Sequence, residues 1–170
     1  FCFGTNSLDD QVEIKMDHTL IRHMSGAGIQ AFSTDISMSN SLIHNCSAFL
    51  FSSFVGGRYT FDHCTLTNEP NFFVRDEPSF AVLDNFPNDP SLVGDIQLQL
   101  TNSIVWGSEL SEFLVANPNG GAVELVIENN IIKSSEAIAG NQTSTDFNFP
   151  GFTDPFSFDY TLDSLSIAVD

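Results

Sequence analysis

Apolar and polar residues alternate in short stretches along this chain, and one such pattern recurs five times. The aligned units read MDHTLI, MSNSLI, FDHCTL, LTNSIV and IENNII. Because the apolar positions repeat every second residue, the pattern predicts β-strands and not helices. Two sets of side chains are expected to point inward: Met16, Phe61, Leu100 and Ile127 before the central residue, and Ile21, Ile43, Leu66, Val105 and Ile132 after it.

The central residue of each unit is a His or an Asn, and the chain must bend there. Asn tolerates the left-handed backbone conformation, and His is also enriched in it. Stacked copies are expected to form a structural ladder of His18, Asn40, His63, Asn102 and Asn129. Metal ligation and acid–base chemistry are the alternative roles for His18 and His63; the structural role is preferred.

The spacing of the units predicts a stacked repeat. Intervals between the central residues are 22, 23, 39 and 27, and a third strand is expected near residues 28–33, 48–53, 79–86 and 112–117. Three short strands per turn, each pairing with the next turn about 4.8 Å away, build a solenoid. The expected fold is therefore all-β: a single-stranded right-handed parallel β-helix, a solenoid of about five coils.

The longer intervals predict insertions, and the end of the chain predicts a cap. The main insertion falls in residues 69–95 and a smaller one near NPNGG at residues 117–121. Residues 1–133 are expected to form the coils, and residues 134–170 a C-terminal cap segment of the same domain. The aromatic residues expected to cover the final coil, with a sugar-stacking platform as the alternative, are Phe149, Phe152, Phe156, Phe158 and Tyr160.

Composition narrows the possible partners. Twenty-two acidic residues against 5 basic ones give a net charge of −17, which disfavours nucleic acid as a partner. The charge indicates surface solubility, with calcium binding as the alternative. Three cysteines without CxxC spacing predict neither a disulfide framework nor a zinc site. No apolar run is long enough to span a membrane, and without a signal peptide or an initiating Met the sequence reads as a piece of a longer or processed protein.

Several stretches resemble a known group of proteins. GGRYTFDHCTLTN, LQLTNSIVWG and the closing DPFSFDYTLDSLSIAVD are similar to secreted bacterial right-handed β-helix proteins of the pectate-lyase-like superfold, in particular to choice-of-anchor proteins. Positions matching the closing motif are Asp154, Pro155, Phe156, Phe158, Tyr160, Leu162, Ser164, Ser166, Ala168 and Asp170. The resemblance implies a β-helix located extracellularly or at the cell surface, associated with the outer membrane. FDHCT also resembles a pectate-lyase stretch that lies in the turn stack of that family, away from its catalytic centre.

The insertion at residues 69–95 is the predicted binding region, because loops inserted over a solenoid face often carry specificity. Candidate ligand-binding residues are Phe72, Phe73, Arg75, Asp76, Glu77 and Asp84. Calcium is the possible cofactor, with Asp84, Asp89 and Asp95 as candidate ligands. A plain structural loop is the alternative.

No complete active site is expected. Outward residues of the third strand, such as Gln30, Asp84 and Glu112, do not supply the grouped carboxylates and basic residues that β-helix hydrolases, esterases and lyases need. The sequence therefore favours a non-catalytic, secreted or surface-anchored domain that binds polysaccharide or acts as a scaffold. The alternative is a polysaccharide lyase or other carbohydrate-active enzyme, such as a glycoside hydrolase, with catalytic coils partly outside this sequence.

Overall fold

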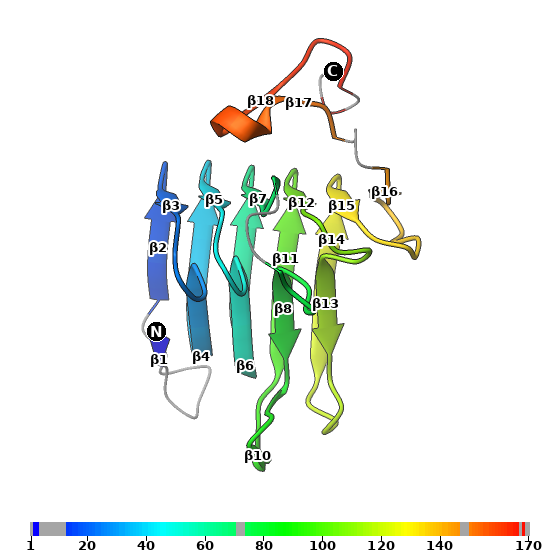
Figure 1. The fold of residues 1–170 in the computed structure, drawn as a ribbon. Coiled ribbons are helices and arrows are strands. Elements are labelled where there is room, and N and C mark those ends of the chain that lie inside the picture. The colour runs from blue at the N-terminus through cyan, green and yellow to red at the C-terminus, as the bar shows by residue number, and fades with distance from the viewer. Residues whose placement is uncertain (1, 4–12, 71–73, 147–149, 167, 169–170) are drawn as a thin grey trace.

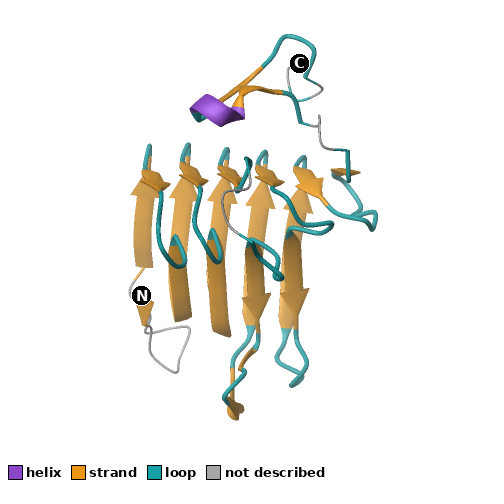
Figure 2. Cartoon of the chain, viewed as in Figure 1, coloured by secondary structure: helices purple, strands orange, loops and turns teal. Residues whose placement is uncertain are grey.

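The computed structural model describes residues 2–3, 13–70, 74–146, 150–166 and 168, and these residues are almost entirely β (Figure 2). Its strands are β1 (Cys2–Phe3), β2 (Glu13–Asp17), β3 (Leu20–Arg22), β4 (Ile29–Ser39), β5 (Leu42–His44), β6 (Phe51–Asp62), β7 (Thr65–Thr67), β8 (Phe80–Leu83), β9 (Asn85–Phe86), β10 (Asp89–Val93), β11 (Ile96–Thr101), β12 (Ile104–Trp106), β13 (Phe113–Ala116), β14 (Val123–Glu128), β15 (Ile131–Lys133), β16 (Gln142–Ser144), β17 (Phe152–Asp154) and β18 (Asp159–Leu162). Within the described ranges the only helix is a 3-10 turn at Pro155–Ser157. The prediction of an all-β chain is confirmed.

Two parallel sheets carry most of the strands. In the larger sheet β2, β4, β6, β11 and β14 lie side by side, and β1, β8 and β13 extend it along the first halves of β4 and β6. The smaller sheet has the order β16-β15-β12-β7-β5-β3, and every neighbouring pair is parallel. In Figure 1 the strands of successive units lie next to one another, in the order of the chain from blue to yellow. Each unit thus contributes one strand to each sheet, which is compatible with a solenoid.

The register of the strands aligns equivalent residues of the units. Met16 pairs with Met38, Met38 with Phe61, Phe61 with Leu100 and Leu100 with Ile127. In the smaller sheet the aligned row is Ile21, Ile43, Leu66, Val105 and Ile132. Both rows belong to one hydrophobic cluster, as the alternation predicts.

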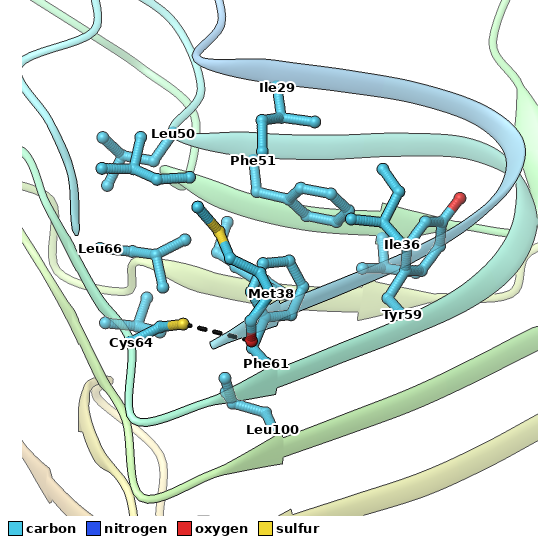
Figure 3. Packing of buried hydrophobic residues seen from close by; sticks show 14 of the residues in the cluster. Ile29, Ile36, Met38, Leu50, Phe51, Tyr59, Phe61, Cys64, Leu66 and Leu100 are labelled. Atoms are coloured by element: carbon cyan, nitrogen blue, oxygen red, sulfur yellow. Dashed lines mark hydrogen bonds between the residues drawn. The ribbon is translucent and has the colours of Figure 1, made fainter. Parts of the chain in front are cut away.

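Aromatic rings fill the centre of this cluster (Figure 3). The ring of Phe51 lies 4.9 Å from that of Phe61 and 5.1 Å from that of Phe80, and all three side chains are fully buried. Burial of each such side chain contributes about 1.5–3 kcal/mol to stability. The thiols of Cys46 and Cys64 are free and buried among these residues, as expected for small fillers.

In the first units, the third strand does not end where the sequence predicts. β4 and β6 do not break after this strand but continue through a bulge, where Ser33, Val55 and Gly56 have positive φ angles of 45°, 62° and 62°. In the later units the same corner is opened by insertions, namely the β9–β10 hairpin and the loop at residues 117–122. The bulge and the two insertions therefore occupy the same position in the repeat.

The C-terminal segment does not lie where the sequence suggested. β16 adds a strand to the smaller sheet, and the β17–β18 hairpin then crosses back over the outer face of that sheet (Figure 1). Phe152 and Leu162 pack against Ile104, Trp106 and Ile131 there. The physical reason is that the outer face of the smaller sheet carries apolar side chains, which burial beneath the hairpin stabilises.

Gly57 is a sensitive point of the bulge. Its φ is +129°, and a Cβ there would collide with the hydroxyl of Tyr59 and lie 2.6 Å from the carbonyl oxygen of Thr34. We expect Gly57→Ala to lower the free energy of unfolding by about 2–4 kcal/mol in urea titrations. Gly26→Ala is the control, because a Cβ at Gly26 has no atom within 4 Å; a change within about 0.5 kcal/mol is expected. Equal losses in both variants would contradict this account of the bulge.

Candidate functional site

A groove runs along the stack between the bend and the C-terminal segment. Its main part has a volume of about 870 Å³ and a continuation has about 460 Å³. His63 and Thr65 line both parts, so the groove extends over all five units. Residues lining the main part are His63, Cys64, Thr65, Asn102, Ser103, Ile104, Asn129, Asn130, Ile131, Gly140, Asn141, Gln142, Leu162 and Ala168.

The bend residues form one edge of the groove. His18, Asn40, His63, Asn102 and Asn129 have φ angles of 48°, 47°, 52°, 50° and 58°. The backbone N–H of each donates to a carbonyl oxygen further along the stack, for example His63 to Thr101 and Asn102 to Glu128. The left-handed conformation thus keeps this edge in hydrogen-bonding register from one unit to the next.

Two aspartates link the bend residues across the units. Asp62 accepts hydrogen bonds from the Asn102 amide at 2.9 Å and the Thr101 hydroxyl at 2.8 Å, and the Nδ1 atom of His63 lies 3.0 Å from its other oxygen. These hydrogen bonds, that of Asn102 first, lower the pKa of Asp62. Asp62 therefore stays ionised and holds the imidazole of His63 with its Nε2 edge toward open space.

Asp17 repeats the arrangement of Asp62 two units earlier. It accepts from Asn40 at 3.0 Å and from Ser39 at 2.7 Å, and the Nδ1 atom of His18 lies 2.7 Å away. Its pKa is also lowered, first by the Asn40 hydrogen bond. The sequence analysis predicted the bend residues but not the bridges that these two aspartates make across units.

A second ladder lies one residue further into the groove, at Ser41, Ser103, Asn130 and Asn141. Their side-chain oxygens accept from backbone N–H groups of the preceding unit, as Asn130 does from Ser103 at 2.8 Å and Asn141 from Asn130 at 3.0 Å. Buried backbone donors require such partners. In the sequence, the signal for this second ladder was the small residue that follows the His or Asn of each unit.

The groove has uncharged hydrogen-bonding groups to offer. Asn129 and Gln142 are exposed, and their side chains make no hydrogen bond to other described residues. The His63 side chain is 61% exposed. Within the described ranges no Asp, Glu, Lys or Arg lines the main part of the groove. Successive units repeat about every 4.8 Å, so these groups suit an extended, hydroxyl-rich ligand better than an ion.

The described candidate residues of the insertion differ in burial. Phe72 and Phe73 lie outside the described residues, and Asp76 and Glu77 are exposed. Arg75, in contrast, is buried beneath the loop. The insertion is thus anchored to the domain through a residue that the sequence offered as a ligand contact.

Arg75 pairs with Glu112 inside the protein. The Nη2 atom of Arg75 lies 2.7 Å from Oε1 of Glu112, and Nη1 lies 3.2 Å from Oε2. Glu112 also accepts from the backbone N–H groups of Ser79 and Glu109. Burial acts to raise the pKa of Glu112, but Arg75 and these donors outweigh it, so the pKa lies below its usual value. The expectation that Glu112 faces outward is wrong, because its charge is neutralised by Arg75 in the interior.

The three aspartates proposed as calcium ligands have separate partners. Asp84 is fully buried, which corrects its expected outward position, and accepts from the N–H groups of Asn119 and Gly121 at 3.1 and 3.0 Å. Asp95 accepts from Ala122, and Asp89 from Ser91. The described residues include no group of three or more His, Cys, Asp or Glu side chains placed to hold a metal. Calcium binding by these residues stays a prediction.

Comparisons with known proteins give no direct answer on function. The chain matches no protein-family model, no curated protein and no solved structure. In the described part of the chain there is no helix with the length and apolarity needed to cross a membrane. The case for a function therefore depends on the geometry of the groove.

The left-handed bend can be tested at His63. We expect His63→Ala to lower the free energy of unfolding by about 1–2 kcal/mol, because Ala is disfavoured at a φ of 52°. His63→Asn, which tolerates this conformation, is the matched variant and should lose less than about 0.5 kcal/mol. If Asn costs as much as Ala in urea unfolding, the imidazole and not the backbone conformation is the important feature.

A double-mutant cycle tests the buried ion pair. Glu112→Ala leaves Arg75 without its counter-charge, and we expect a loss of about 3–5 kcal/mol. Arg75→Ala with Glu112→Ala should lose less than the sum of Arg75→Ala alone and Glu112→Ala alone, with a coupling of at least about 1 kcal/mol. Glu77→Ala, at an exposed neighbour, is the control. Additive losses would mean that the pair does not hold the insertion.

Proposed function

We propose that the chain is a right-handed parallel β-helix of about five coils and that it binds a neutral polysaccharide, without catalysis, along the groove. The observation that carries the proposal is the repetition of uncharged hydrogen-bonding side chains on successive units of one groove. A sugar chain also repeats hydroxyl groups along its length, so a ligand and a protein with matched repeats can form the same contact several times.

The composition of the groove supports a neutral ligand and not an anionic one. Asn129 and Gln142 offer amides, and the half-buried Leu162 offers apolar surface beside them. Carbohydrate sites combine such apolar surface with a few placed polar groups. The acidic surface, with a net charge of −17, repels polyanions such as polyuronates at long range.

The proposed architecture and location have separate support. The in-register parallel strands of each unit suit a solenoid whose coils close through the third strand. The resemblance of the closing motif to choice-of-anchor proteins supports an extracellular or cell-surface location, and binding of a polysaccharide suits such a location.

A carbohydrate-active enzyme, such as a polysaccharide lyase, is the second candidate, and one observation favours it. The Asp62–His63 pair places an oriented imidazole at the edge of both parts of the groove. An imidazole oriented by a carboxylate is a general base in many enzymes. The other oxygen of Asp62 accepts from Asn102 and Thr101, however, and these bridges between units favour the structural role.

Affinity measurements on a panel of soluble neutral polysaccharides, with polygalacturonate as the anionic comparison, test the proposal. We expect Asn129→Ala with Gln142→Ala to weaken binding of the neutral ligand at least about tenfold in titration calorimetry. Gln99→Ala removes an exposed amide from the outer face of the larger sheet and should leave the affinity unchanged.

The same assay separates binding from catalysis. If the wild-type chain releases products from the bound polysaccharide and His63→Asn does not, the protein is an enzyme and the non-catalytic proposal is overturned. Equal affinities for all variants would show that the groove is not the binding site.

A further inference from the structure

The β17–β18 hairpin forms one wall of the groove but is weakly attached to the rest of the molecule. Leu162 and Ala168 line the groove from this side. Backbone hydrogen bonds of residues 150–166 stay within the segment, as for Asp163 to Gly151 and Ser166 to Asp163, and none of those among described residues joins it to either large sheet. Among the described residues, only side chains hold the hairpin to the two large sheets, so it can lift without breaking the strand ladders.

The attachment centres on Tyr160 and His44. The Tyr160 hydroxyl donates to the carbonyl oxygen of Glu69 at 2.7 Å, and it lies 3.2 Å from the Asn45 side-chain oxygen and 3.4 Å from Nδ1 of His44. The His44 ring lies 4.9 Å from the Tyr160 ring and 5.6 Å from the Phe158 ring. His44 is 1% exposed.

Within the described ranges, no Asp or Glu side chain forms an ion pair with His44 that would balance a charge on its ring. The ionisable groups near its ring are His23 and Arg22 from the first unit and Tyr160 from the hairpin. Glu69 also lies at this interface, and its backbone carbonyl oxygen accepts the hydrogen bond of the Tyr160 hydroxyl. In the aligned row of the smaller sheet its neighbours are Arg22 and Thr67. Two of these groups are basic, so protonation of His44 adds both a buried charge and a repulsion.

We propose that the hairpin is a lid on the groove, closed while His44 is neutral and released when His44 takes up a proton in mildly acidic surroundings. This inference rests on the proposed function, because it makes acid the signal that opens the polysaccharide groove and releases its ligand. At neutral pH the lid keeps Leu162 against the ligand; in acid one wall of the groove is withdrawn.

The sign of the effect follows from the two states of the lid. In the closed state burial, followed by the nearby His23 and Arg22, lowers the pKa of His44 from 6.5 to about 4. Once the lid lifts, the pKa returns toward its ordinary value, so the open state binds the proton more readily. Closure is therefore strongest above about pH 6.5 and weakens as the pH falls toward 4, by roughly 30-fold at pH 5 and up to roughly 300-fold below pH 4.

Trp106 is a built-in reporter of the lid. It is the single tryptophan of the chain, it is fully buried, and Phe152 and Leu162 of the hairpin pack against its cluster. We expect the protection of its indole N–H from exchange, measured by NMR against free indole at the same pH, to fall roughly 30-fold between pH 7.5 and pH 5. Far-ultraviolet circular dichroism should stay unchanged over this range. Constant protection with an intact fold would overturn the proposal.

Three variants identify the responsible group. His44→Phe keeps an aromatic ring but cannot titrate, so the protection should become independent of pH. His23→Asn keeps a residue that tolerates the φ of 55° and should retain the transition. Tyr160→Phe removes the hydroxyl contacts and should lower the protection at pH 7.5 as well. A transition that persists in His44→Phe would assign the titration to Glu69, whose pKa is raised by burial, and would overturn the role of His44.

Ligand measurements separate this inference from the proposed function. Neutral polysaccharide should bind the wild-type chain more weakly at pH 5 than at pH 7.5 and bind His44→Phe equally at both. Binding that is independent of pH in both proteins would leave the groove as the site and overturn the lid. A lid transition without any polysaccharide binding would overturn the proposed function, and with it the regulatory role, while leaving the conformational switch in place.

Discussion

The left-handed backbone at one residue of every unit is the constraint on which the other features depend. Because His18, Asn40, His63, Asn102 and Asn129 all turn the chain in the same way, the strands before and after them meet their equivalents in register. Register in turn decides which side chains share a row. Phe61 meets Met38 and Leu100 in the core, and Asp62 meets Ser39 and Thr101 on the outer face. A shift of one residue would exchange these two rows and place carboxylates in the interior.

Much of this architecture was predictable because it repeats. Each unit repeats the same features: the apolar period of two, the bend residue and the position at which insertions occur. A prediction made from one unit is therefore supported by the others. The C-terminal hairpin was not predictable in the same way. Its contacts join Tyr160 to His44 and Glu69, 116 and 91 residues away in the chain. No local pattern indicates such a pairing, and the aromatic character of the segment suits a cap at the end of the stack equally well.

The candidate site was harder to predict than the fold for a physical reason. Charged residues in a loop suggest a binding site, but burial can convert them into internal partners, as it does for Arg75 and Glu112. The groove, in contrast, is lined by Asn, Gln, Ser and Thr, which the sequence explains as turn residues. Only the three-dimensional arrangement distinguishes amides used inside the ladder, such as Asn130, from those left facing the groove, such as Asn129.

The bridges made by Asp17 and Asp62 make neighbouring units unequal. Each carboxylate reaches forward to a hydroxyl and an amide of the following unit, so Asp-His rungs alternate with Ser-Asn and Thr-Asn rungs over the first four units, and the fifth has Glu128 and Asn129. The true module of the edge is therefore a pair of units, one giving the acceptor and one the donors. Gene duplication or deletion of a single unit puts two acceptors or two donor sets next to each other, whereas gain or loss of a pair restores the order. Arrays of this kind are expected to change length in even steps.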